Sequence, residues 1–231
     1  MKTLRIGGLV ALVSAVAVVA PLAACAKEAG QPSRATVADS AATAEGAVLD
    51  AYDRKAEAFY GSFRFEGLFV EHYRTLAQGV RAASVVVVGT VLRVTETRVL
   101  RTEGGDHPYI GVVIRPTVLA GTLAPQFADE LTVEFDGVTL ADLKGAMPVG
   151  HQAVWVLRKK SDPAPGQGTD EATPEEADYF RVVNPQGLFI QGAESVATPL
   201  AETLPGASDM ATEARGYARL SDLVSAVRGV A

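Results

Sequence analysis

Residues 84–94 read Ser-Val-Val-Val-Val-Gly-Thr-Val-Leu-Arg-Val, and this run decides the fold class. β-branched side chains fit the pleated surface of a strand, and an apolar run of this length predicts a strand buried on both faces. Gly89 interrupts the run. A glycine inside a strand predicts a bulge or a sharp bend, of the kind that turns the corner of a small barrel.

Three further strands are predicted directly downstream. A turn at Gly104-Gly105-Asp106 precedes a second strand over 109–119. Alternation of apolar and polar residues predicts a third strand over 130–135, and a fourth is predicted over 151–158. The fourth contains Trp155, the only tryptophan, and since both faces of that strand are apolar we expect the indole in the core rather than on an exposed stacking surface. The same expectation applies to Phe135, Tyr179 and Phe180.

Two short strands close the β-rich region. They cover 179–183 and 188–191, and the turn Asn184-Pro185-Gln186-Gly187 predicts that they form a hairpin. The preceding segment, 160–178, contains three prolines and several carboxylates and is predicted to be an exposed loop. A connection of this length is either functional or simply tolerated.

Helices are predicted on both sides of the strands. The apolar positions that carry this prediction are Val48, Tyr52, Ala56 and Phe59 for the first helix; Phe69, Tyr73, Leu76, Val80 and Ala83 for the second; and Leu220, Leu223, Val224 and Val227 for the last, with Ser221 or Asp222 as its cap. Strand and helix do not alternate between residues 84 and 192, which excludes a doubly wound parallel sheet. The predicted class is therefore mainly β with flanking helices (β+α): a small antiparallel barrel of five to six strands, two helices before it and one short helix at the C-terminus.

Three segments resemble secreted bacterial domains similar to the netrin and tissue-inhibitor OB barrels. They are Ala83 to Val91, Val118-Leu119-Ala120-Gly121, and Pro148-Val149-Gly150 leading into 153–157. The resemblance covers roughly residues 70 to 192 and implies an OB-like barrel. Such domains usually have Lys-Gly where this chain has Ala120-Gly121, so no role of that lysine carries over.

The N-terminus has the features of an export signal. Lys2 and Arg5 precede an apolar stretch over 6–20, and residues 1–24 are predicted to be a secretory signal peptide. The stretch is shorter than the about 20 apolar residues of a spanning helix. The sequence Leu22-Ala23-Ala24-Cys25 resembles the lipobox of bacterial lipoproteins. That resemblance implies cleavage before Cys25, a diacylglycerol on its thiol and further acylation, such as palmitate, on its amino group.

The rest of the chain is predicted to be one tethered domain. Residues 25–46 hold the lipidated Cys25 and a polar, disordered tether, and residues 47–231 form a single globular domain. Within it we expect a helical lead-in over 47–83, the barrel over 84–192 and a C-terminal extension over 193–231. Cys25 is the only cysteine, so no disulfide can form within the chain.

The net charge of the chain limits the kinds of partner that it is expected to bind. The chain has 21 basic and 27 acidic side chains, and loss of Lys2 and Arg5 with the leader leaves 19 basic groups and a formal charge of −8. An acidic chain lacks the concentrated basic surface that binds phosphate backbones. Nucleic acid is therefore not a predicted partner.

Residues able to carry chemistry are few. There is no Gly-x-Ser-x-Gly motif, and the three histidines are His72, His107 and His151. His107 and His151 are weak candidates for a metal site, which would need them to converge with carboxylates. The carboxylates considered for it are Asp106, Asp136 and Asp142. The acidic group Asp170, Glu171, Glu175 and Glu176 could attract Ca²⁺, but a solvated loop is the favoured interpretation. No cofactor is predicted.

These observations favour a noncatalytic binding or structural module, anchored outside the cytoplasm in the cell envelope through lipid on Cys25. Its expected partners are the membrane and an envelope protein or glycan. One alternative is a protease-inhibitor-like module, which rests on the tissue-inhibitor resemblance; those inhibitors use a free N-terminal cysteine that this chain would have lipidated. The other alternative is an envelope hydrolase, which would require Glu134 or Asp136 beside a histidine.

Overall fold

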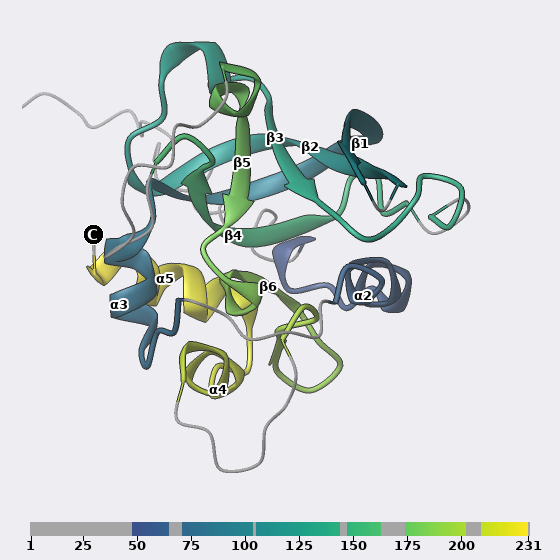
Figure 1. Cartoon of the computed structure of the whole chain (residues 1–231). Coiled ribbons are helices and arrows are strands. Elements are labelled where there is room, and N and C mark those ends of the chain that lie inside the picture. Colours follow the sequence, from purple (N-terminus) through teal and green to yellow (C-terminus); the bar gives the residue numbers. More distant parts are fainter. Residues whose placement is uncertain are drawn as a thin grey trace, which may run out of the picture.

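The computed structural model describes residues 48–64, 71–103, 105–143, 147–162, 174–201 and 209–230. The predicted leader, Cys25, the tether over 26–46 and most of the predicted loop over 160–178 lie outside these residues. The α-helices are α2 (Arg54–Gly61), α3 (Leu76–Ala82), α4 (Met210–Arg215) and α5 (Leu220–Val230). The strands are β1 (Val85–Thr102), β2 (Gly105–Gly121), β3 (Leu131–Phe135), β4 (Gln152–Lys159), β5 (Tyr179–Val182), β6 (Leu188–Gln191) and β7 (Val196–Ala197). The prediction of a mainly β domain with flanking helices is confirmed (Figure 1).

The strands form one seven-stranded sheet in the order β1-β2-β3-β5-β4-β6-β7. Because β1 also pairs with β4, the strands β1, β2, β3, β5 and β4 form a closed ring. The expectation of a purely antiparallel arrangement was wrong, since β3 and β5 run parallel. The reason is geometric: strand direction cannot alternate all the way around a ring of five.

Strands β1 and β2 form a long hairpin and pair along most of their length. Of the bulge or sharp bend predicted at Gly89, the bulge was wrong, because the register runs without a break from Val87 to Val91; the bend stays a prediction. The register shifts lie between Val86 and Val87, between Val91 and Arg93, and between Glu96 and Val99. Gly89 serves packing instead, since a Cβ there would lie 2.8 Å from the indole of Trp155.

The predicted hairpin of the last two strands was also wrong. Strands β5 and β6 both pair with β4, at successive positions along it, and no pairing joins them to each other. The turn residues form a short 3-10 helix, Pro185–Gly187, in which the side chain of Asn184 accepts a hydrogen bond from the backbone N–H of Gln186. The turn therefore redirects the chain along β4 without reversing it.

Apolar side chains form two buried clusters on opposite faces of the sheet. One includes Val85, Val87, Ile114, Val133, Trp155 and Leu157 and receives Phe59, Tyr60 and Phe63 from the region of α2. The other includes Val86, Val154, Val156 and Phe189 and is covered by α3, α4 and α5, which lie together in Figure 1. Burial of Trp155, Phe135 and Phe180 is confirmed, whereas Tyr179 is only half-buried.

The first two predicted helices are shorter in the structure than their apolar spacing indicated. Helix α2 begins after Asp53, whose carboxylate accepts hydrogen bonds from the backbone N–H groups of Lys55 and Ala56. Val48 and Tyr52 are exposed and lie outside α2. Helix α3 begins after Thr75, so Tyr73 precedes it, and Phe69 lies outside the described residues.

Helix α5 takes its N-terminal contacts from elsewhere in the fold. Neither Ser221 nor Asp222 caps it as predicted; the backbone N–H of Leu220 donates to Gln191, and that of Ser221 donates to Asp50. Helix α4 was not predicted. No helix within the described ranges is both long and apolar enough to cross a bilayer.

Candidate functional site

The two histidines considered for a metal site lie beside different parts of β1 (Val85–Thr102) and do not converge. His107 is exposed and pairs with Leu100 near the tip of the β1–β2 hairpin, whereas the carbonyl of His151 accepts from the backbone N–H of Val91. His72 is exposed, ahead of α3. Across the parts of the chain that the structure describes, no group of three or more His, Cys, Asp or Glu residues could hold a metal ion.

Glu134, proposed above as one acid of a hydrolase, is paired with cations and a hydroxyl. Its fully buried carboxylate accepts hydrogen bonds from Thr97, from Arg98 Nε at 3.2 Å and from Lys160 Nζ at 2.7 Å. Thr97 reaches it across Gly111, where a Cβ would clash with the Thr97 methyl group. Asp136, the other proposed acid, is exposed.

The same cluster holds the base of the predicted loop over 160–178. Lys160, at its start, binds Glu134, and Glu176, near its end, binds Arg98 at 2.9 Å. Arg98 and Lys160 both lie over the ring of Tyr109, at 4.5 and 4.4 Å from its centroid. Burial is the main cause that raises the pKa of Tyr109. These contacts position the ends of the loop, and Asp170 and Glu171 lie outside the described residues.

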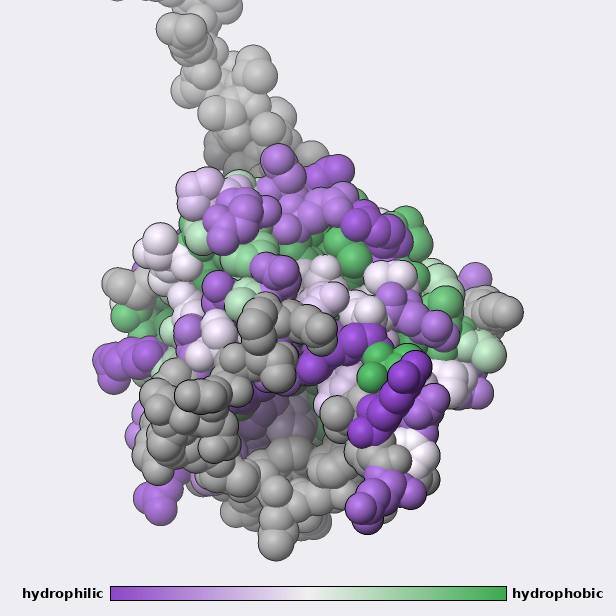
Figure 2. Space-filling model, turned by 45° about the horizontal axis from the view of Figure 1, so that its top comes forward, coloured by the Kyte–Doolittle hydropathy of each residue, from purple (hydrophilic) through white to green (hydrophobic). Residues whose placement is uncertain are grey.

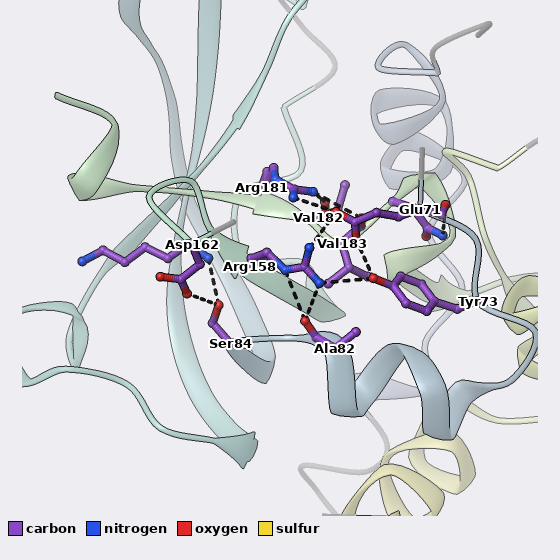
Figure 3. A network of polar contacts seen from close by, with 11 residues as sticks. Glu71, Tyr73, Ala82, Ser84, Arg158, Asp162, Arg181, Val182 and Val183 are labelled. Atoms are coloured by element: carbon purple, nitrogen blue, oxygen red, sulfur yellow. Dashed lines mark hydrogen bonds and ion pairs between the residues drawn. The ribbon is translucent and has the colours of Figure 1, made fainter. Parts of the chain in front are cut away.

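A second network joins the segment before α3 to β4 and β5 (Figure 3). One oxygen of Glu71 accepts from Arg158 at 2.6 Å and from Arg181 at 2.8 Å, and the other accepts from the hydroxyl of Tyr73. Arg158 also donates to the carbonyl of Ala82. The side chains of Glu71 and Arg158 are only 8% and 3% exposed. This network therefore stabilises the packing of the segment before α3 and does not present a surface to a ligand.

Three buried polar atoms near Tyr60 of α2 have no hydrogen-bond partner within the described ranges. They are the hydroxyl of Tyr60, Nδ1 of His151 and Nε1 of Trp155. The ring of Tyr60 lies 5.7 Å from that of His151 and 5.6 Å from that of Trp155. Burial lowers the pKa of His151, partly opposed by the charge of Asp53. The neutral imidazole is therefore the form that the fold favours.

A pocket of about 260 Å³ lies between α2, α4 and the turn that joins β6 to β7. Residues 192–199 form much of its wall, and four charged side chains complete it: Glu57 from α2, Arg64 just after α2, Glu194 from the turn and Arg215 from α4. This pocket is the candidate functional site, because its charged groups face open space, whereas Glu134 and Glu71 are enclosed by their partners. On the face shown in Figure 2, hydrophobic residues lie in separate areas among hydrophilic ones.

The two arginines of the pocket are fixed by adjacent residues. Arg64 donates through Nε and Nη2 to the carbonyl of Pro199, at 3.3 and 3.1 Å. Arg215 donates through Nε and Nη2 to the hydroxyl of Thr198, at 3.3 and 3.1 Å. Thr198 and Pro199 are consecutive and both buried, so the two guanidinium groups are bound at neighbouring positions of the pocket wall.

No motif in the sequence indicated this pocket. Its four charged residues are spread between positions 57 and 215 and come from three regions of the chain: α2 and the residues after it, the β6–β7 turn, and α4. Each is an ordinary charged residue in its local sequence, and only the tertiary fold brings them together.

Comparison with known proteins identified no relative: no family model, no curated protein and no solved structure matches this chain.

Proposed function

We propose that this chain is a lipid-anchored extracytoplasmic protein whose β-rich domain is a noncatalytic binding module of the cell envelope. Lipid on Cys25 would hold the module at the membrane, and residues 26–46 would space it from the surface. The OB-like description is part of the proposal, and the ring of five strands supports it because the OB barrel has five strands.

The observation that carries the binding role is the pocket with four charged side chains. Small-molecule sites are concave and present a few polar groups that fix the orientation of the ligand. Glu57, Arg64, Glu194 and Arg215 provide such groups around one concavity. Glu134, by contrast, is bound to Arg98 and Lys160, which supports a structural role for it rather than that of a general base.

The anchor is tested by metabolic labelling of bacteria that express the full chain with an alkyne analogue of palmitate. We expect the native chain to take up label and to sediment with membranes, because two or more acyl chains hold a protein durably. Cys25→Ser should abolish both, while the neighbouring Ser33→Ala should change neither. An unlabelled native chain would contradict the anchor.

The binding role is tested by thermal-shift screening of the purified full chain against amino acids, peptides, sugars and cell-wall fragments. A ligand should raise the melting temperature and be recovered chemically unchanged, as mass spectrometry would show. Conversion of the ligand to a product would contradict the noncatalytic assignment.

A further inference from the structure

We propose that the pocket between α2, α4 and the β6–β7 turn binds a small zwitterion: an amino acid or short peptide with a free carboxylate and a free ammonium group. This inference rests on the proposed binding role and names the ligand class. Its basis is that two cationic and two anionic side chains line one space.

The arginines would bind the carboxylate. A guanidinium has five N–H donors in a planar fork that matches a carboxylate. Arg64 and Arg215 each direct two nitrogens to a single oxygen of the protein, which leaves Nη1 for a ligand. Neither arginine has a carboxylate partner within the described ranges, because all six ion pairs found there involve other residues.

The arginines are also oriented before a ligand arrives. They bind to consecutive residues, Thr198 and Pro199, whose Cα atoms are about 3.8 Å apart. Both guanidinium groups therefore contact the same short stretch of the pocket wall. Fixing a long side chain in advance reduces the entropy lost on binding.

The glutamates would bind the ammonium group. Glu57 lines the pocket from α2 and accepts a hydrogen bond from the hydroxyl of Tyr52 through Oε2, at 3.0 Å, which leaves Oε1 for the ligand. Glu194 lines it from the β6–β7 turn and is exposed. Among the described residues these carboxylates form no ion pair with Arg64 or Arg215, so charges of both signs in the pocket are not neutralised by each other.

The volume of the pocket and its four charges indicate which class of ligand it would bind. Pockets for drug-sized ligands have volumes of about 300 to 1,000 Å³, and about 260 Å³ suits a smaller molecule. The four charges sum to zero, so a doubly charged phosphate would meet two like charges as well as two opposite ones. A molecule with one group of each sign avoids that repulsion.

The test is isothermal titration calorimetry of the purified full chain, from whichever cell fraction it is recovered, with glycylglycine as the probe. We expect saturable binding, which weakens at least about tenfold when either charge is removed from the ligand, since a hydrogen bond to a charged group contributes that much or more. Acetylation of the amine removes one charge and methyl esterification of the carboxylate removes the other. These comparisons use the native protein and do not depend on the folding of any variant.

Variants identify the pocket. The pair Arg64→Gln and Arg215→Gln should abolish binding, and so should the pair Glu57→Gln and Glu194→Gln. Arg101→Gln, which changes an exposed arginine on the β1–β2 hairpin, is the matched control and should bind like the native chain. Circular dichroism melting checks that each variant is folded.

Three outcomes would overturn the inference: no saturable binding of glycylglycine, phosphate binding more tightly than glycylglycine, or equal loss of binding in Arg101→Gln. If other ligands stabilise the native chain while glycylglycine does not bind, the binding role stands and only the ligand class is wrong. The palmitate labelling result is independent of all three.

Discussion

The indole of Trp155 lies directly over the backbone of Gly89, so closely that a Cβ at position 89 would be 2.8 Å from indole Cδ1. Trp155 is fully buried, and the same Cβ would lie 2.4 Å from the end of the Ile114 side chain. Gly89→Ala should therefore lower the free energy of unfolding by about 2 kcal/mol, the typical cost of overpacking a core. Urea denaturation followed by tryptophan fluorescence measures it.

The matched control is Gly61→Ala, in the last position of α2, where a Cβ would meet no atom within 4 Å. This change should be neutral or slightly stabilising, because alanine favours the helix over glycine by up to about 1 kcal/mol. Equal destabilisation by the two substitutions would show that the contact with Trp155 is not what excludes a side chain at Gly89.

Removing the charge of Glu134 should destabilise the fold. In Glu134→Gln, Arg98 and Lys160 lose their shared carboxylate in a site where their side chains are only 18% and 13% exposed. We expect a loss of about 3 kcal/mol in the free energy of unfolding, the lower end of the cost of breaking a buried ion pair. Glu130→Gln, which breaks the exposed pair with Arg93, should change stability little, because exposed pairs contribute little. If the two variants lost the same amount, the burial of Glu134 would not explain its effect.

Local sequence was sufficient to predict strands but not their partners. The apolar run over 85–94 lies within β1, and the alternation predicted over 130–135 matches β3 except at its first residue, because one strand's hydrophobic pattern is a local property. Pairing is not local. The turn at Asn184 has the composition of a hairpin turn, yet β5 and β6 both bind β4, because open backbone groups on β4 were available to each in turn.

The role of Gly89 shows a similar limit. A glycine in a strand is compatible both with a bulge and with close approach of another side chain, and only the position of Trp155 on the neighbouring strand decides between them. The pocket was even less predictable from local sequence than the role of Gly89. Arg64 and Arg215 are 151 positions apart, and their shared attachment to Thr198-Pro199 depends on how α2 and α4 pack around the β6–β7 turn.

The network around Glu71 should be essential for the attachment of the segment before α3. Arg158→Met removes the buried partner of Glu71 and two hydrogen bonds to Ala82. We expect a loss of about 3 kcal/mol, because Glu71 then stays largely buried with Arg181 as its only cation. Hydrogen exchange should show faster exchange in residues 71–84.

A double-mutant cycle separates the ion pair from the rest of the Arg158 contacts. Adding Glu71→Gln to Arg158→Met should cost less than the sum of the single changes, because the uncompensated carboxylate is gone. Arg81→Met, at an exposed position in α3, is the control and should leave exchange over 71–84 unchanged. Simple additivity would mean that Glu71 and Arg158 stabilise the fold independently.

The stability of the fold should fall in mild acid because of His151. Burial next to Tyr60 lowers the pKa of His151 from its usual 6.5, and the nearby charge of Asp53 offsets this only in part. Between the lowered folded pKa and 6.5, the unfolded chain binds more protons than the folded one, so stability rises with pH across this window and is lost as pH falls through it. Urea unfolding between pH 8 and pH 5 should show this slope in the native chain and in His107→Gln, which changes an exposed histidine, but a smaller slope in His151→Gln. An unchanged slope in His151→Gln would assign the acid sensitivity to other groups.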